Sequence, residues 1–434
     1  EVVCAPKVQI FTVFFSPERL CDVSLGSSVN RGLKAKEQKT MSLTNVFIVS
    51  AARTPIGNFN GCYSKLSAAD LGAVVIKEIL ARANVKAEDV SEVILGQALT
   101  AGQGQNPGRQ AALAAGLPLE TSAYVLNMLC GSGLKSVQLG YQAIVTGDAK
   151  IVVCGGQESM TKAPHVIHLR DGIKMGTGSL LDTMLHDGLT DAGYNIHMGV
   201  TAENLAKKYG ITREEQDAQA LSSQQLAEES QKKGYFDKEL VPVTIKDRKG
   251  VETVIKVDEY PKHGSSMAEM QKLRPVFNQT GTVTAGNASG INDSAAAVLL
   301  MGEDEMKRRN LKPLARIVGF AHGGVDPREM GEGPVPAVNA LCTKIGWKKE
   351  EVDVFELNEA FAAQAIAVQR ALGLDPKKIN IHGGAIALGH PIGASGCRVL
   401  VTLLYAMERI NAKRGIASLC IGGGMGIAIA VERS

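Results

Sequence analysis

The sequence predicts an α/β fold built from two similar halves. Strand-like apolar runs alternate with helix-like segments from residue 45 onward, and the same order of runs recurs after about 260 to 270 residues. Glycine (47) far outnumbers Phe (10), Tyr (8) and Trp (1), which indicates tightly packed layers and many backbone turns. Strand–helix alternation is typical of βαβ units around a layered, largely parallel sheet. The recurrence indicates an internal duplication.

The first half begins with the apolar run 46–49, which has the composition of a buried strand and precedes a loop with Pro55 and Gly57. A Ser-Ala-Ala-Asp segment at residue 67 then opens an apolar-periodic helix. In order, the sequence predicts strands at 46–49, 93–95, 124–128 and 151–154, helices at 67–83 and 109–115, and a helix that follows 130–133 and ends near 147.

The second half repeats this order of elements. Residues 315–319 match the first predicted strand and 352–356 the second, while 418–423 match the Val-Val-Cys-Gly-Gly run at 152–156. We therefore expect two halves of one topology, each about 120 residues long.

The duplication sets the expected domain boundaries. We expect an N-terminal half at 41–160, completed by part of 285–310, and a C-terminal half at 311–434. The segment 161–285 between them is richer in Met, His, Lys and loop residues, and contains a charged helix near 213–233. We expect this insertion to be a lid over a shared site.

Residues 1–40 differ from the rest of the chain. An apolar run at 8–15 is followed by a polar segment that ends before Met41. Four acidic residues make this stretch a poor mitochondrial presequence, which is normally acid-poor. We expect an extension outside the fold, with Met41 as the effective start.

Composition excludes several functional classes. The net charge is +3 and the basic residues are scattered, which argues against nucleic-acid binding. No window approaches the ~18 apolar residues of a membrane span, so we expect a soluble protein with no membrane partner. The eight cysteines include no C-x-x-C pair, which favours free thiols over disulfides or a zinc site. No other residue spacing indicates a metal.

Cys130 is the first candidate catalytic residue. It lies between a predicted strand and a glycine-containing helix start, in Asn-Met-Leu-Cys-Gly-Ser-Gly-Leu-Lys. A thiol at a helix N-terminus faces unpaired N–H groups, which lower its pKa and favour the thiolate. These residues alone leave a nucleophile and a structural thiol equally open.

His390 lies in a glycine-rich loop with Pro391 next to it, where an imidazole could donate to a reacting oxygen. A structural histidine bonded to a backbone carbonyl is the alternative, and is favoured if the segment is taken alone. Cys420 is followed by Ile421 and a Gly-Gly-Gly run, whose N–H groups could form an oxyanion hole. Asn358, after a predicted strand, could orient a water or cap a helix.

Together these segments resemble the thiolase family, most closely the acetoacetyl-CoA thiolases (acetyl-CoA acetyltransferases) of the cytosolic animal type. The resemblance covers about residues 45–431. It rests on the Cys130 segment, Asn358-Glu359-Ala360-Phe361, Gly389-His390-Pro391 and the run that begins at Cys420. It implies a thiolase fold, with two βαβαβαββ halves in a five-layered αβαβα core and an inserted loop domain.

The resemblance also implies a mechanism. Cys130 would take the acyl group from a first CoA thioester, and Cys420 would remove a proton from the α-carbon of a second acetyl-CoA. His390 and a water on Asn358 would stabilise the enolate oxygen, and the N–H groups of Cys130 and Gly422 would form an oxyanion hole. The reaction is a ping-pong Claisen condensation of two acetyl-CoA to acetoacetyl-CoA and CoA, or its reversal, with no metal or redox cofactor.

The CoA contacts implied by the resemblance lie mainly in the insertion. They are Leu189, His197, Met198, Lys262, Phe277, Ala285, Ser289, Ala360 and Phe361. Lys262 departs from the Arg of many relatives, and the two cations are not interchangeable at a stacked or bidentate contact. His382 is a second departure, where relatives often have Asn or Glu.

Three other activities are open. A degradative 3-ketoacyl-CoA thiolase would accept longer chains, and the segment 187–199 favours the acetoacetyl type over it. A catalytically silent acyl-CoA binder would need neither cysteine, and a decarboxylating ketoacyl synthase usually has histidine in place of the second cysteine. We expect a cytoplasmic protein, with the mitochondrion as the alternative, and by resemblance a homo-oligomer, dimer or tetramer.

Overall fold

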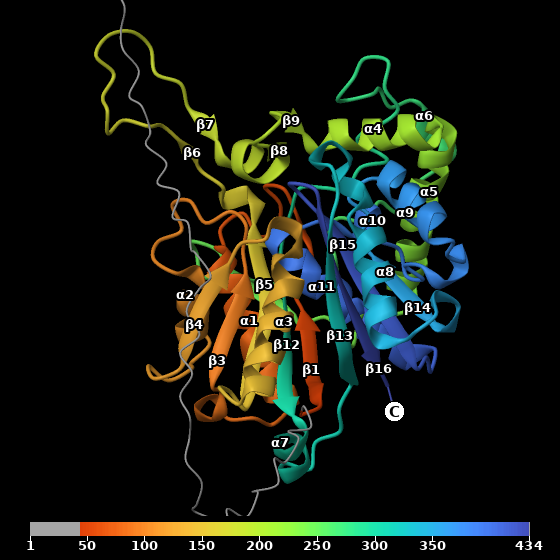
Figure 1. Ribbon diagram of the computed structural model, residues 1–434. Helices are drawn as coiled ribbons and strands as arrows, with labels where there is room; N and C mark the ends of the chain where they lie inside the picture. Colours follow the sequence, from red (N-terminus) through yellow and green to blue (C-terminus); the bar gives the residue numbers. More distant parts are fainter. Residues whose placement is uncertain (1–43, 434) are drawn as a thin grey trace, which may run out of the picture. The chain divides into compact units, whose positions relative to one another are not determined.

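Ten strands form one mixed sheet within residues 44–433, the part of the chain that the computed structural model describes (Figure 1). The strands are β1 (Val46–Arg53), β2 (Gly57–Asn58), β3 (Glu92–Gly96), β4 (Ser122–Leu126), β5 (Ile151–Ser159), β12 (Asn292–Gly302), β13 (Ala315–Gly324), β14 (Val354–Leu357), β15 (Arg414–Ile421) and β16 (Met425–Glu432). Their hydrogen-bonded order is β4-β3-β5-β12-β1-β13-β16-β15-β14, and β2 pairs with β12. The extension predicted at 1–40 and Met41 lie outside the described residues.

The strand order confirms the predicted duplication. Outward from β1, antiparallel β12 and β5 are followed by parallel β3; outward from β13, antiparallel β16 and β15 are followed by parallel β14. A register shift interrupts β1 between Ile48 and Ser50, and another interrupts β13 between Ile317 and Gly319, at the equivalent place. The two halves therefore share even their irregularities.

The prediction of a largely parallel sheet was wrong. One strand in each half runs antiparallel to both of its neighbours. In the first half it is β12, between β1 and β5, and in the second half it is β16, between β13 and β15. β12 returns only after the insertion, and β16 follows β15 through a tight glycine turn. A strand joined by so short a turn can pair only antiparallel.

Helices pack on both faces of the sheet and give the fold five layers. They are α1 (Ala68–Arg82), α2 (Pro107–Ala114), α3 (Ser132–Thr146), α7 (Glu303–Arg308), α8 (Pro334–Ile345), α9 (Ala362–Leu372), α10 (Ala385–Leu388) and α11 (Ile392–Arg409). One apolar core joins α3 and α11 to strands of both halves, a second packs α1 and α2 on the first half, and a third packs α8 and α9 on the second. The order is therefore αβαβα, with α3 and α11 in the central layer.

The two central helices touch backbone to backbone. A Cβ at Gly133 of α3 would lie 2.7 Å from the Cys397 nitrogen, and a Cβ at Gly396 of α11 would lie 2.3 Å from the Leu134 nitrogen. Any other residue at either position would separate the helices, because a real Cβ does not approach a backbone nitrogen so closely. This contact brings the N-terminal ends of α3 and α11 together.

The insertion between β5 and β12 contains helices as well as loops and short strands. Its elements are β6 (His165–Val166), β7 (Leu181–Asp182), β8 (Thr190–Asp191), β9 (Ile196–His197), α4 (Met198–Tyr209), α5 (Arg213–Lys232), β10 (Val243–Lys246), β11 (Glu252–Ile255) and α6 (Met267–Gln271). In Figure 1, β6 to β9 and α4 lie above the end of β5. Buried Arg53 of β1 anchors the insertion, because its guanidinium pairs with Glu239 (2.6 Å) and Asp258 (2.6 Å).

Short helical turns complete the description. They are η1 (Ala87–Asp89), η2 (Leu129–Gly131), η3 (Met160–Lys162), η4 (Met184–Leu189), η5 (Pro327–Glu332), η6 (Lys349–Glu351) and η7 (Pro376–Lys378). The predicted strand at 124–128 ends two residues early, at Leu126, so the chain turns into η2 just before Cys130. The predicted strand at 151–154 continues to Ser159, because the polar residues 157–159 still pair with β12 and are buried.

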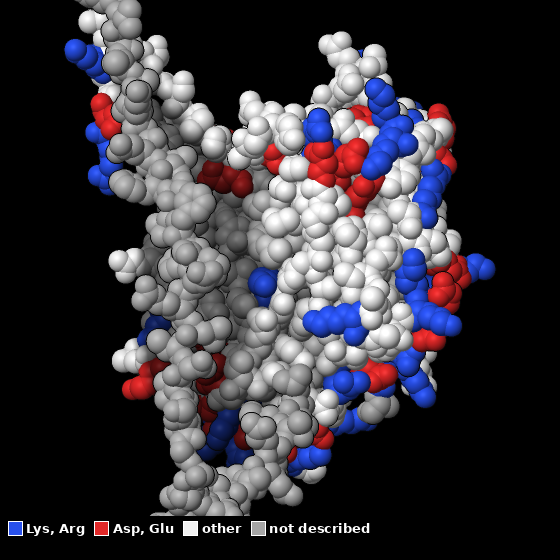
Figure 2. Space-filling view, viewed as in Figure 1, with Lys and Arg blue, Asp and Glu red and all other residues white. Residues whose placement is uncertain are grey.

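The helices of the described residues and the charges on one face bear on possible partners. None of the helices within 44–433 combines the length and apolarity needed to cross a bilayer. Figure 2 shows Lys and Arg side chains lying among Asp and Glu side chains on this face, rather than along one groove. A mixed charge pattern of this kind gives little electrostatic attraction for a polyanion.

Candidate active site

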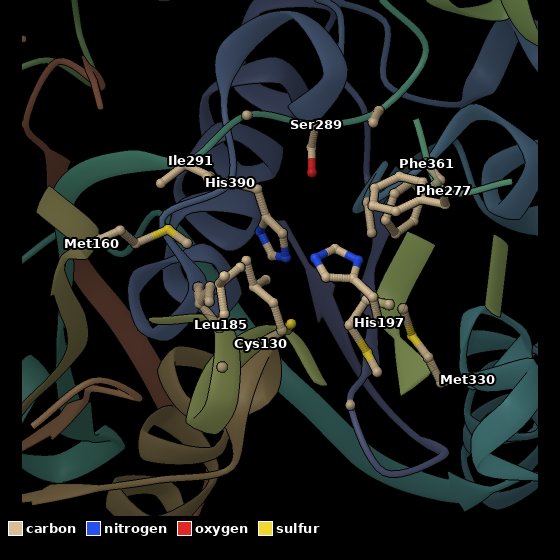
Figure 3. A pocket seen from close by; sticks show the side chains of 18 residues that line it. Cys130, Met160, Leu185, His197, Phe277, Ser289, Ile291, Met330, Phe361 and His390 are labelled. Carbon is tan, nitrogen blue, oxygen red and sulfur yellow. The ribbon is translucent and has the colours of Figure 1, made fainter. Parts of the chain in front are cut away.

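Cys130 and His390, two of the four residues predicted to be catalytic, face one cavity of about 290 Å³ (Figure 3). It lies where the central helix layer meets the insertion. Of the predicted site residues, those that line it are Cys130, Leu189, His197, Met198, Phe277, Ser289, Ala360, Phe361, His390 and Gly422. Segments up to 290 residues apart in the sequence therefore border one space.

Cys130 and His390 occupy equivalent places in the two halves. Cys130 lies in η2, directly before α3, and His390 lies directly before α11. Because α3 and α11 meet at their N-terminal ends, the thiol and the imidazole face the same cavity from different halves (Figure 3). The duplication thus explains how the fold brings these two groups together.

The prediction of a lowered pKa for Cys130 was wrong. The protein around the thiol raises its pKa to about 12, because the charged form loses its hydration. The N–H groups of Gly422 and of Cys130 itself oppose this rise, which means that both are directed at the sulfur. The helix proper begins only at Ser132, so Cys130 receives less of the helix dipole than the sequence suggested.

The turn that presents Cys130 is strained. Leu129 has φ +47°, a left-handed conformation that non-glycine residues rarely adopt. Ser132 holds the turn: its hydroxyl accepts the Met128 N–H (2.8 Å) and donates to the Leu129 carbonyl (2.7 Å). Strain that the surroundings enforce in this way is typical of functional sites.

His390 is buried and neutral. Burial, followed by the charge of Arg398, lowers the pKa of its imidazole to about 3. Its Nδ1 lies 2.6 Å from the Ser395 hydroxyl, which itself donates to the Pro391 carbonyl (3.0 Å). The Ser395 oxygen must therefore accept from Nδ1–H, and this assigns the proton to Nδ1 and leaves Nε2 as the nitrogen that can accept.

Asn358 lies behind His390 rather than among the residues that line the cavity. Its Nδ2 lies 3.5 Å from His390 Nε2, the ring nitrogen that can accept, and its Oδ1 accepts from Nη2 of buried Arg398 (3.4 Å). A guanidinium only donates, so this contact fixes which end of the amide faces the imidazole. Glu356 lies in β14, two residues before Asn358, and burial raises the pKa of its carboxyl to about 8.

Cys420 is fully buried at the end of β15, next to the cavity. Burial raises the pKa of its thiol above the ordinary range, and the charge of the Cys130 thiolate raises it further, so the two sulfurs are neighbours. The turn that follows places Gly423 (φ +81°) and Gly424 (φ +80°) in the left-handed region. This turn aims the Gly422 N–H at Cys130. Six cysteines in the described chain are free thiols.

Two predicted CoA contacts lie elsewhere. Lys262 and Ala285 line a second cavity of about 350 Å³, together with Tyr260, His263 and Ile386. The structure therefore separates them from the residues around Cys130.

Sequence reasoning missed several apolar residues that line the first cavity. They are Met160, Leu185, Gly188, Ala288, Gly290, Ile291, Met330 and Ile392. Isolated apolar residues carry no signal of function in a sequence that is 45% hydrophobic.

One wall of the cavity is aromatic. The His197 ring stacks on Phe277 at 4.6 Å, and Phe277 meets Phe361 edge to face at 6.3 Å. Phe277 can pack this closely because Gly199 has no side chain; a Cβ there would lie 2.2 Å from the ring. Burial lowers the pKa of His197, so this wall is uncharged near neutral pH.

Comparisons with known proteins point in one direction. The model of the thiolase N-terminal domain matches residues 46–304, and that of the thiolase C-terminal domain matches 311–433. The chain is 58% identical to the cytosolic acetyl-CoA acetyltransferase of Mus musculus (89% of this chain, 98% of the relative). It is 57% identical to the acetyl-CoA acetyltransferase of Paracoccus denitrificans (90% and 100%).

Solved structures agree in fold. The acetyl-CoA acetyltransferase of Bacillus anthracis superposes with a TM-score of 0.88 at 42% identity, covering 90% of this chain and 99% of that one. Human mitochondrial 3-ketoacyl-CoA thiolase superposes equally well, with a TM-score of 0.88 at 43% identity and coverage of 90% and 100%. The fold alone therefore does not separate these two activities.

Proposed function

The chain belongs to the thiolase family, and we propose that it is an acetyl-CoA C-acetyltransferase. It would join two acetyl-CoA molecules into acetoacetyl-CoA and CoA, or catalyse the reverse thiolysis. The observation that carries the proposal is the meeting of a thiol and a neutral imidazole with an unprotonated Nε2 at one cavity, with two backbone N–H groups aimed at the sulfur.

The first half-reaction acetylates Cys130. Because the pKa of this thiol is high and that of His390 low, free thiolate is scarce, and the proton must pass to Nε2 as the sulfur attacks the thioester carbonyl. The N–H groups of Cys130 and Gly422 donate to the oxyanion. The bond between the acetyl carbon and the CoA sulfur breaks, and CoA leaves with the proton of Cys420.

The second half-reaction forms the carbon–carbon bond. Cys420, now a thiolate, takes a proton from the α-carbon of a second acetyl-CoA. Nε2–H of protonated His390 and a water held by Asn358 donate to the enolate oxygen. The enolate carbon attacks the acetyl group, the Cys130 sulfur leaves, and the His390 proton returns to it. Protein groups and thioesters complete every step, so the proposal assigns no cofactor.

The first cavity would hold the thioester end of CoA. The residues assigned to it are Leu189, His197, Met198, Phe277, Ser289, Ala360 and Phe361. We assign the second cavity, with Lys262 and Ala285, to the adenine side. Lys262→Arg and Lys262→Ala should then change the KM for acetyl-CoA and leave kcat within twofold, whereas an equal fall in kcat would place Lys262 near the chemistry.

Mass spectrometry tests the proposal. Incubation with acetoacetyl-CoA and CoA should add one acetyl group to Cys130. Stoichiometric acetyl-CoA binding by calorimetry without an acetyl-enzyme would instead favour a silent binder. Turnover on C4, C8 and C16 ketoacyl-CoA decides chain length, and equal rates would favour a degradative 3-ketoacyl-CoA thiolase.

Compartment and assembly belong to the same proposal. We propose a cytoplasmic protein, with the mitochondrion as the alternative, because the mouse and rat relatives are named cytosolic. We propose a homo-oligomer, dimer or tetramer, and domain limits of 41–160, 161–285 and 311–434. Fractionation and light scattering of the full chain test these assignments.

A further inference from the structure

Glu158 is a fully buried carboxylate that the proposed chemistry does not use. It lies near the end of β5, and its oxygens accept three backbone N–H groups. Oε2 accepts from Ala98 (2.9 Å) and Gly393 (2.8 Å), and Oε1 accepts from Leu99 (3.2 Å). Burial raises the pKa of its carboxyl to about 7, and the three N–H groups oppose this rise because they stabilise the charged form.

The first partner segment leads to the nucleophile. Ala98 and Leu99 pack in one apolar cluster with Leu129 and Cys130. Asn127 joins the same two segments, because its Nδ2 donates to the Ala98 carbonyl (3.2 Å) and its Oδ1 accepts the Leu129 N–H (2.9 Å). The position of residues 98–99 therefore sets the position of the strained turn that carries Cys130.

The second partner segment leads to His390. Gly393 lies in the first turn of α11, where backbone N–H groups lack helical partners, and the N-cap residue Pro391 offers no side-chain bond. Glu158 takes one of these N–H groups from outside the helix. A Cβ at Gly393 would lie 2.6 Å from Glu158 Oε2 and 2.7 Å from the Ala98 nitrogen, so the segments meet across a glycine.

We propose that Glu158 is a positioning residue that fixes the Cys130 thiol relative to the His390 imidazole, by holding residues 98–99 and the start of α11 on one carboxylate. This inference rests on the proposed function, since it assumes that the proton passes from Cys130 to His390. Figure 3 shows both side chains projecting into the cavity from separate segments. Their separation therefore depends on what joins those segments.

Glu158→Gln tests the proposal. The NH₂ of the glutamine would face either the Leu99 N–H or the Ala98 and Gly393 N–H groups, so at least one of the three bonds is replaced by a contact between two donors. We expect kcat for thiolysis to fall about 100-fold with KM within threefold, since a displacement of about 1 Å can cost this much. Alkylation of Cys130 by iodoacetamide separates two explanations. The Glu158 charge raises the pKa of Cys130, so a purely electrostatic role predicts faster alkylation, whereas positioning predicts slower alkylation.

Two further variants complete the test. Gly393→Ala keeps the carboxylate but displaces its partner, and should reproduce the fall in kcat even where Glu158→Gln does not fold. Asp353→Asn is the matched control: Asp353 accepts the Lys413 and Arg414 N–H groups at the opposite end of β14 and β15. Its kcat should stay within twofold of wild type.

The outcomes are distinguishable. Wild-type protein that forms no acetyl-Cys130 would contradict the proposed function. Wild-type protein that forms it, with kcat within twofold in folded Glu158→Gln and in Gly393→Ala, would overturn the role of Glu158. Faster alkylation with unchanged kcat would do the same.

Discussion

The turns before α3 and α11 are the same part of the fold built twice, yet they carry opposite chemistry. The first presents a thiol on a strained backbone, with Leu129 in the left-handed region. The second presents an imidazole on a backbone held by Asn292, whose Oδ1 accepts the backbone N–H of His390 (2.9 Å). Burial raises the pKa of the thiol to about 12 and lowers that of the imidazole to about 3. Duplication supplies two equivalent positions. The side chain at one of them, Cys130, gives up a proton, and the side chain at the other, His390, accepts it.

Removing the thiol should have the largest effect. Cys130→Ser should lower kcat for thiolysis by about 10⁴-fold or more and abolish the acetyl-enzyme, because a hydroxyl is a far weaker nucleophile here. Steady-state rates and intact-protein mass measure both. Cys62→Ser is the control, with activity within twofold. Near-normal thiolysis by Cys130→Ser would contradict the assignment of Cys130 as the nucleophile.

Cys420→Ser should separate the two half-reactions. Cys130 and His390 remain, so a single acetylation of Cys130 from acetyl-CoA should still be seen by mass spectrometry, whereas acetylation from acetoacetyl-CoA should be slow because Cys420 no longer protonates the departing enolate. Exchange of the α-protons of acetyl-CoA with deuterated solvent should fall by about 10³-fold, because the base is lost. Full exchange in this variant would assign the base to another group.

The pH dependence of Cys130 alkylation tests the raised pKa. The thiolate is the reacting form, so its fraction rises about tenfold per pH unit below the pKa and levels off above it. With a pKa of about 12, the iodoacetamide rate should keep rising from pH 7 to pH 10. Free cysteine, measured in parallel, should level off near its ordinary pKa of about 8.5. A plateau for Cys130 near pH 7 would restore the expectation of an activated thiolate.

Alanine at the contact between α3 and α11 should have the smallest effect. Gly133→Ala and Gly396→Ala each force the helices apart, and overpacking of this kind costs about 1–3 kcal/mol of unfolding free energy. Both variants should lose similar stability in denaturant titrations, since the contact is shared. Stability equal to wild type in either one would show that the helices can separate freely.

The α/β class and the duplication could be predicted from the sequence, because they follow from the order of strand-like and helix-like segments. The resemblance singled out Cys130 and His390, and the structure places both at one cavity, while their roles stay predictions. The prediction of a largely parallel sheet failed for two reasons. β12 joins the sheet only after the chain returns from the insertion, and β16, which a short turn connects to β15, was not expected as a separate strand. The pKa of Cys130 was predicted with the wrong sign, because the position of a cysteine next to a helix can be read from neighbouring residues, whereas its burial depends on residues far away in the sequence. No local pattern singles out Glu158 or Ser395, because the partners of Glu158 lie 59 to 235 residues away in the sequence and Ser395 is an ordinary hydroxyl within a helix.

The burial of α11 makes the two halves depend on each other. Fifteen of its 18 residues are buried, and α3 and the inner faces of both halves supply much of that cover. A chain containing one half alone would expose the apolar surface of its central helix to water, which costs free energy. Neither half therefore has a complete core of its own, and each completes the core of the other.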